Sequence, residues 1–100
     1  MTNLLLILLL IVGCSKTIDV DKLVERGGLY YEINSDKPFS GETVEYFENG
    51  QKSEERTYKN GFEDGLWTNW YENGQKMYET TFKDGKEIDY KAWDEDGNKK

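Results

Sequence analysis

The sequence predicts an all-β fold: consecutive antiparallel β-hairpins that form one elongated, single-layer sheet after a short apolar export signal. Three observations predict this fold. Segments recur along the chain, the copies contain Asn-Gly or Asp-Gly dipeptides, and 14% of the residues are aromatic although few aliphatic residues follow position 13. Turn dipeptides favour hairpins, and aromatic side chains suit the pleated surface of a strand. A repeated hairpin accounts for all three observations.

Residues 1–13 are predicted to be a signal peptide. Leu4 to Val12 is a continuous apolar run without a polar side chain. A helix needs about 20 apolar residues to span a bilayer, so this run is too short to be a transmembrane segment and fits the core of a secretory signal. The run ends in Ile11-Val12-Gly13-Cys14, which resembles a bacterial lipobox. The resemblance implies that the Cys14 thiol is acylated and that Cys14 becomes the N-terminus of the mature protein.

Acylation at Cys14 predicts attachment to a membrane of the cell envelope, which would be the outer membrane in a Gram-negative bacterium. Two or more acyl chains, such as palmitate, hold a protein stably on a bilayer. Residues 14–20 would then form the lipidated N-terminus and a short tether to the folded part.

Residues 41–100 are predicted to form the hairpin repeats. Residues 45–52 return as 69–76, and residues 57–61 return as 81–85, both 24 positions later. A third, shorter copy begins at residue 93. Such self-similarity at a fixed period is typical of repeat architectures, in which each unit packs against its neighbours.

The dipeptides Asn49-Gly50, Asn73-Gly74 and Asp96-Gly97 predict two-residue type I′ turns, because both turn residues tolerate positive φ. Such a turn pairs Tyr46 with Ser53. The same register in the next copy pairs Trp70 with Met77.

Upstream of the repeats, residues 21–40 are predicted to form a divergent first hairpin around Gly27-Gly28. In the repeats, aromatic residues mix with Glu, Lys and Thr on both faces of the expected sheet. A β-sandwich needs one clean apolar face on each sheet, so this mixture favours a single layer.

The repeat unit resembles the bacterial variant of the MORN repeat over about residues 29–98. The resemblance depends on the Asn-Gly-Gln-Lys core and on the Gly65-Leu66-Trp67 segment, which occur in the expected order. It implies successive hairpins in one extended sheet and no catalytic residue set. One branch of this family is labelled as antitoxins of toxin–antitoxin systems.

Composition excludes several classes of function. The chain has no His and a single Cys, so it has no imidazole base, no intrachain disulfide and no His-liganded metal. Its net charge of −7 argues against nucleic acid, which binds proteins through Lys and Arg. The acidic stretch at residues 94–98 lacks the remainder of a calcium loop and is explained as a turn. We therefore expect no enzymatic activity, cofactor, metal or nucleic-acid partner.

The leading hypothesis is a lipid-anchored, non-enzymatic β-repeat protein that contacts another protein or has a structural role. The alternatives are a module that binds carbohydrate or peptidoglycan, and an antitoxin-like partner of a toxin. The aromatic residues of the repeats could form the binding surface, or they could simply hold the sheet together. The candidate binding residues are Tyr46, Trp67, Trp70, Tyr71, Tyr78 and Trp93.

Overall fold

The structure is a computed structural model that describes residues 16–100. The predicted signal peptide and Cys14 lie outside the described residues. The elements in chain order are β1 (Thr17–Asp19), the 3-10 helix η1 (Val20–Lys22), β2 (Leu23–Arg26), β3 (Leu29–Glu32), β4 (Gly41–Tyr46), β5 (Lys52–Lys59), β6 (Phe62–Trp70), β7 (Lys76–Lys83) and β8 (Lys86–Ala92).

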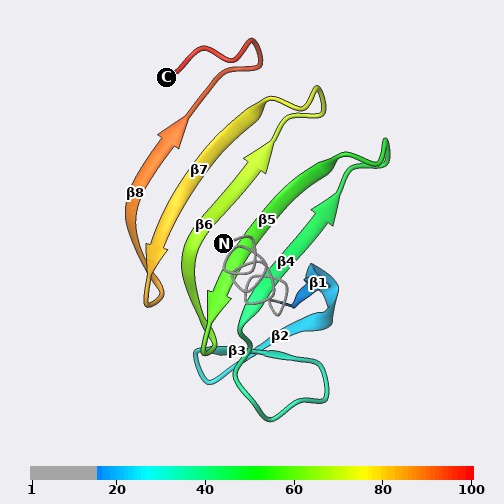
Figure 1. Ribbon diagram of the computed structural model, residues 1–100, viewed down its shortest axis with the longest axis vertical. Helices are drawn as coiled ribbons and strands as arrows, with labels where there is room; N and C mark the ends of the chain where they lie inside the picture. Colours follow the sequence, from blue (N-terminus) through cyan, green and yellow to red (C-terminus); the bar gives the residue numbers. More distant parts are fainter. Residues whose placement is uncertain (1–15) are drawn as a thin grey trace, which may run out of the picture.

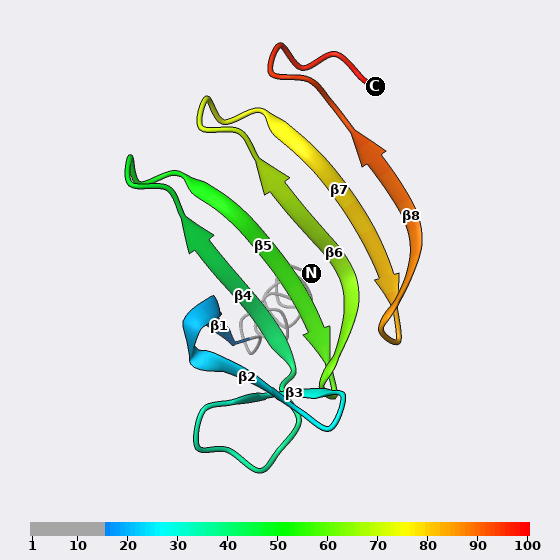
Figure 2. The same cartoon turned by 180° about the vertical axis from the view of Figure 1, so that it is seen from behind.

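Six strands form one sheet in the order β1-β4-β5-β6-β7-β8 (Figures 1 and 2). From β4 to β8 each strand pairs antiparallel with the next strand along the chain. The predicted all-β fold of consecutive antiparallel hairpins is therefore confirmed, but the predicted single layer is wrong where β2 and β3 form a second, separate sheet. Only strands that are adjacent in sequence pair in this part, as expected of a repeat whose units contact only their neighbours.

The loops at Asn49-Gly50, Asn73-Gly74 and Asp96-Gly97 have three residues, so the two-residue type I′ turns predicted there are wrong. In the first loop, the Gly50 N–H donates to the Phe47 carbonyl at 3.0 Å, and the Phe47 N–H donates to the Gln51 carbonyl at 2.8 Å. Gly50 has a φ of +89°, whereas Asn49 has no positive φ. The loop is a type I turn closed by a left-handed glycine. It is favoured because the Asn49 Oδ1 accepts the Gln51 N–H at 2.9 Å.

The longer loop shifts the pairing of the strands by one residue. Tyr46 pairs with Lys52 and not with Ser53, and a β-bulge lies beside this pair. In the second copy Trp70 pairs with Lys76 and not with Met77. The two copies therefore share one register, although it differs from the expected one.

The type I′ turns occur at the other end of the hairpins. Asn60 and Gly61 have φ values of +51° and +87°, and Asp84 and Gly85 have +51° and +83°. Both turn residues thus adopt the left-handed conformation that a two-residue hairpin turn requires. These turns join β5 to β6 and β7 to β8.

The segment that was expected to be a tether contributes a strand. Thr17–Asp19 forms β1 and pairs in parallel with residues 42–44 of β4. The Glu42 N–H donates to the Lys16 carbonyl at 2.7 Å, which extends the pairing by one residue. The correction follows from the free edge of β4, since unpaired backbone groups at a sheet edge attract any adjacent extended segment.

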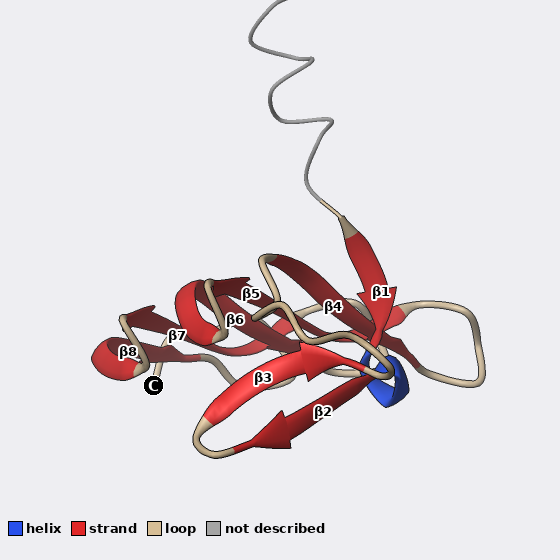
Figure 3. Cartoon of the chain, turned by 90° about the horizontal axis from the view of Figure 1, so that it is seen from below, coloured by secondary structure: helices blue, strands red, loops and turns tan. Residues whose placement is uncertain are grey.

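Strands β2 and β3 form a separate two-stranded sheet that lies against one face of the large sheet (Figure 3). We call this side the hairpin face. The Tyr30 ring lies 5.1 Å from the Tyr58 ring, and Phe39 lies 5.7 Å from the same ring. Phe39, Val44 and Tyr58 are the buried hydrophobic residues of the described chain. The small apolar core therefore sits mainly where the β2–β3 hairpin covers the first repeat.

Candidate functional site

The loops at one end of the sheet are linked by side chains of the Asn-Gly-Gln sequence. The Asn49 side-chain amide donates to the Glu72 carbonyl at 3.3 Å, and the Asn73 amide donates to the Glu95 carbonyl at 2.9 Å. Each asparagine thus connects its own loop to the loop of the next copy. The recurrence of asparagine is explained by this contact together with the turn.

The glutamine and glycine of the same sequence also meet between copies. A Cβ at Gly74 would lie 3.1 Å from the Gln51 Oε1, and a Cβ at Gly97 would lie 3.2 Å from the Gln75 Oε1. Each glycine therefore leaves room for the glutamine of the preceding copy. These contacts give the Asn-Gly-Gln core a structural role in stacking the hairpins.

The predicted binding residues do not form one surface. Residues directly opposite each other in an antiparallel pair point to the same side, and side chains alternate along a strand. Trp67 and Tyr78 therefore lie on the hairpin face with Tyr58, whereas Trp70 lies on the other side, which we call the outer face. The odd spacing between Trp67 and Trp70 is the sequence signal that separates them.

Trp67 is part of a stack on the hairpin face. The Arg56 guanidinium lies 3.9 Å from the centroid of the Trp67 ring, and the Phe82 ring stacks on Trp67 at 5.6 Å. Such cation–π and aromatic pairs hold neighbouring strands together. The Trp67 Nε1 is buried and has no hydrogen-bond partner in the described chain. The geometry makes this tryptophan a packing residue that connects β5, β6 and β7.

Arg56 is also the centre of a partly buried charge cluster. It lies 2.8 Å from Glu54 and 3.9 Å from Glu63. Burial would lower the pKa of Arg56, but the hydrogen bond with Tyr58 and the charge of Glu54 together raise it. Burial raises the pKa of Glu63, and the Arg56 charge only partly opposes this rise. Burial likewise raises the pKa of the Tyr58 hydroxyl. Arg56 is thus the shared cation of two carboxylates, Glu54 and Glu63.

The remaining candidates lie at the loop end of the sheet. The Tyr71 hydroxyl donates to the Trp93 carbonyl at 2.8 Å, so Tyr71 ties the last copy to the one before it. The Lys76 Nζ lies 5.8 Å from the centroid of the Trp93 ring. Because Lys76 is opposite Trp70, Trp93 shares the outer face with Trp70.

Tyr46 occupies the same position on β4 as Trp70 occupies on β6, and it is 54% exposed. The outer face thus carries three equivalent aromatic residues: Tyr46, Trp70 and Trp93. Sequence reasoning missed the lysines between them. Lys52 and Lys76 stand opposite Tyr46 and Trp70, and the one-residue shift in register explains why their position was not predicted.

The acidic turn at the end of the chain is a local hydrogen-bonded structure. The Asp94 Oδ1 accepts the N–H groups of Asp96 and Asn98 at 3.0 and 2.9 Å. The hydrogen bond from Asn98 is the main reason that the pKa of Asp94 is lowered. Within residues 16–100 the structure has no group of three or more acidic or cysteine side chains that could hold a metal ion. In the same range it has no helix long and apolar enough to cross a membrane.

Comparison with known proteins shows what the repeat is similar to. Two segments, residues 39–60 and 63–84, match the model of the MORN repeat variant. No curated protein and no solved structure matches the chain. The first segment contains the β4–β5 hairpin, and the second contains most of the β6–β7 hairpin. These two hairpins, with their shared register and equivalent loop contacts, are therefore both similar to the MORN repeat variant.

Proposed function

We propose that this chain is a lipid-anchored, non-enzymatic β-repeat protein of the bacterial cell envelope whose sheet binds a partner protein. The anchor would be the acylated Cys14, at the end of the lipobox-like sequence. Strand β1 begins at Thr17, three residues after Cys14. An extended chain spans at most about 3.5 Å per residue, so the sheet would begin within roughly 10 Å of the anchor. This favours a sheet held close to the membrane.

One observation supports the protein-binding role most directly. The β2–β3 hairpin covers one end of the hairpin face, whereas the other end is exposed to solvent. The β2–β3 hairpin covers Tyr58 in the first repeat, and Tyr58 is only 3% exposed. At the far end, Tyr78 packs against Tyr90 at 6.0 Å, and Tyr90 is 54% exposed. Exposed aromatic residues are enriched at protein interfaces. A partner would cover Tyr78 and Tyr90 as the β2–β3 hairpin covers Tyr58.

A non-enzymatic role agrees with the charge cluster on the hairpin face. Glu54 and Glu63 share Arg56 as a partner. A pair of catalytic carboxylates needs to face each other across a cleft that holds the substrate. The paired charges instead support the packing of the strands.

The anchor is tested by metabolic labelling with an alkynyl fatty acid in a bacterial host. We expect the wild-type chain to incorporate the label and to fractionate with membranes, and the Cys14→Ser variant to do neither. Equal labelling of the two proteins would exclude acylation at Cys14.

The partner surface is tested by a photo-crosslinking amino acid at position 90, with position 66 as the matched control. Leu66 is 47% exposed and lies on the outer face, opposite Thr81. We expect a discrete crosslinked product from position 90 that position 66 does not produce. The same products from both positions would contradict a partner on the hairpin face.

A further inference from the structure

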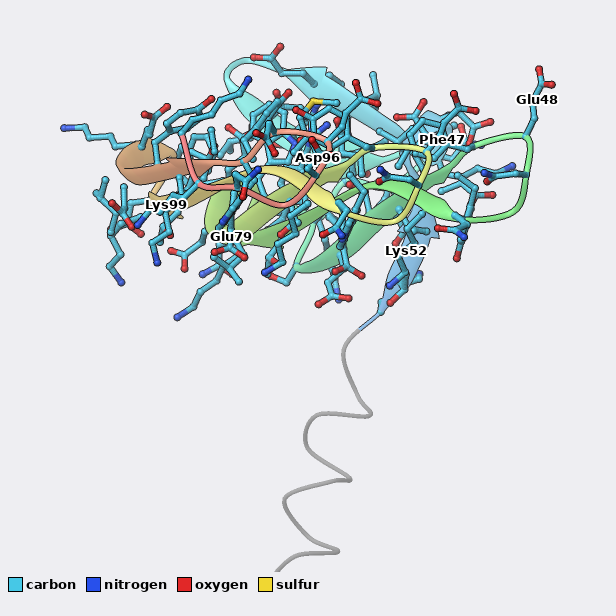
Figure 4. The ribbon with its side chains drawn as sticks, turned by 90° about the horizontal axis from the view of Figure 1, so that it is seen from above. Phe47, Glu48, Lys52, Glu79, Asp96 and Lys99 are labelled. Atoms are coloured by element: carbon cyan, nitrogen blue, oxygen red, sulfur yellow. The ribbon has the colours of Figure 1, made fainter. Side chains whose placement is uncertain are left out.

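The outer face carries an alternating row of aromatic residues and lysines at the loop end of the sheet. Tyr46 is opposite Lys52, Trp70 is opposite Lys76, and a β-bridge joins Trp93 to Lys99. Figure 4 shows Lys52 on the side of the sheet away from the β2–β3 hairpin. We call this set the aromatic–lysine row. Its members are Tyr46, Lys52, Trp70, Lys76, Trp93 and Lys99.

Two of the three lysines of the row, Lys52 and Lys76, are paired with neighbouring glutamates. The Lys52 Nζ lies 2.6 Å from the Glu55 Oε2, and the Lys76 Nζ lies 2.9 Å from the Glu79 Oε2. Figure 4 shows Glu79 on the same side of the sheet as Lys52. Each tryptophan therefore has an ion pair beside it that can both donate and accept hydrogen bonds but adds no net charge.

The surface is hollowed beside a tryptophan of the row. Gln51, Lys52, Trp70 and Gly74 line this depression. The corresponding residues of the next copy also meet, because Gln75 approaches Gly97 and Lys76 lies beside Trp93. The row thus presents an aromatic ring, a side-chain amide and an ion pair in each of two successive copies.

The spacing of the aromatic residues is set by the sheet. Tyr46 and Trp70 lie two strands apart, and neighbouring strands are about 4.8 Å apart, so equivalent aromatic residues recur about every 9.6 Å. In a linear β-1,4-linked glycan, successive sugars are turned over, so every second sugar presents the same face. The row has the spacing of every second sugar in such a chain.

We propose that the aromatic–lysine row binds a linear β-1,4-linked N-acetylhexosamine glycan of the kind found in the strands of peptidoglycan. The C–H face of every second sugar would pack on an aromatic ring, whose π-face attracts polarised hydrogens. The ion pairs would bind hydroxyl groups, and the Gln51 and Gln75 amides would bind acetamido groups. A glycan backbone without dense charge also suits a chain with a net charge of −7.

Peptidoglycan fits the spacing in a second respect. Only every second sugar of its strands carries a peptide, so the sugars that contact the aromatic residues would all be the unsubstituted ones. This site lies on the opposite side of the sheet from the proposed protein-binding surface, and it does not depend on that surface.

The experiment is a calorimetric titration of the full-length protein in mild detergent with chitohexaose, the β-1,4-linked hexamer of N-acetylglucosamine. We expect saturable binding, and weaker binding of the trimer, which reaches fewer aromatic residues. Trp70→Ala and Trp93→Ala should each weaken binding about two- to tenfold, the range expected for the loss of one aromatic contact. The matched control is Phe62→Ala, because Phe62 is an exposed aromatic residue at the opposite end of β6 from Trp70.

Three oligosaccharides and one insoluble polymer test the ligand class. Maltohexaose, whose α-linkages remove the repeat of equal faces, should not bind. Cellohexaose should bind more weakly than chitohexaose, and equal binding would refute the contacts with acetamido groups. Purified sacculi should retain the wild-type protein but release the Trp70→Ala/Trp93→Ala double variant. Absence of chitohexaose binding, or binding unchanged in a double variant that retains the wild-type circular dichroism spectrum, would overturn the proposal.

Discussion

Substitution of Gly61 by alanine tests how the β2–β3 hairpin is held against the sheet. Gly61 has a φ of +87° in the turn between β5 and β6. A Cβ at this position would lie 3.0 Å from both Leu29 and Pro38. The turn is also hydrogen-bonded to the covering segment, because the Tyr30 N–H donates to the Gly61 carbonyl at 2.9 Å. The substitution therefore combines backbone strain with a clash at a packed contact.

The two effects can be separated with Gly50→Ala as the matched control. Gly50 has nearly the same φ, +89°, but nothing lies within 4 Å of a Cβ built there. A left-handed conformation costs an L-residue about 1–2 kcal/mol, and we expect Gly50→Ala to lose that amount of unfolding free energy. Overpacking adds about 1–3 kcal/mol, so Gly61→Ala should lose about 2–5 kcal/mol in total.

The assay is urea denaturation, with the unfolding free energy taken from the midpoint and the slope. Hydrogen exchange at Tyr30 provides an independent measurement, because its amide should lose protection in Gly61→Ala but not in Gly50→Ala. Equal losses of free energy in the two variants, with the Tyr30 amide unaffected, would refute the packing of the β2–β3 hairpin on this turn.

Two further predictions concern the loops and the charge cluster. Asn73→Asp removes the amide that donates to the Glu95 carbonyl at 2.9 Å. It should lower the unfolding free energy measured in urea by about 1 kcal/mol. An unchanged unfolding free energy would mean that the contact is dispensable. Glu63→Gln should stabilise the protein at pH 7. Burial raises the pKa of Glu63 above its ordinary value of 4.5, so the stability of the wild-type protein falls as the pH rises through that raised value. This gain in unfolding free energy should vanish in denaturation curves measured below pH 4.5. A gain that persists there would show that it has another cause.

The repeat allowed much of the fold to be predicted from the sequence. The spacing of copies located the hairpins, because strands that alternate with turn dipeptides can pair only with their neighbours over such short connections. The loop type was not predictable from the Asn-Gly dipeptide alone. The same dipeptide forms a three-residue loop at Asn49-Gly50 and a type I′ turn at Asn60-Gly61. The Asn49 side chain bonds within its own loop and to the next copy, and contacts of the second kind exist only in the assembled sheet.

The candidate site was predicted only in part for a related reason. Tyr46, Trp67, Trp70 and Tyr78 lie in strands, whereas Tyr71 and Trp93 follow the ends of β6 and β8. A list of residue types also does not tell which of them share a face. Trp67 and Trp70 lie on opposite faces of the sheet because side chains alternate along β6. The partners of each tryptophan depend on the register, which the loop sets. Arg56 beside Trp67 and Lys76 beside Trp93 could therefore be recognised only once the register was known.

A comparison of equivalent positions explains why the β2–β3 hairpin covers the first repeat and not the second. Trp67 on β6 corresponds to Thr43 on β4, and Phe82 on β7 corresponds to Tyr58 on β5. In the second repeat the large Trp67 ring itself stacks on Phe82. In the first repeat the small Thr43 leaves the Tyr58 ring without such a neighbour.

The side chains of Tyr30 and Phe39 instead contact the Tyr58 ring, and Thr43 is only 1% exposed. The covering hairpin and the small residue beneath it thus depend on each other. A repeat with an aromatic residue at the position of Thr43 packs its own strands, whereas a repeat with threonine needs an added segment. This is the behaviour of a terminal capping unit in a repeat array, because a cap must cover a surface that an interior repeat would bury against its neighbour.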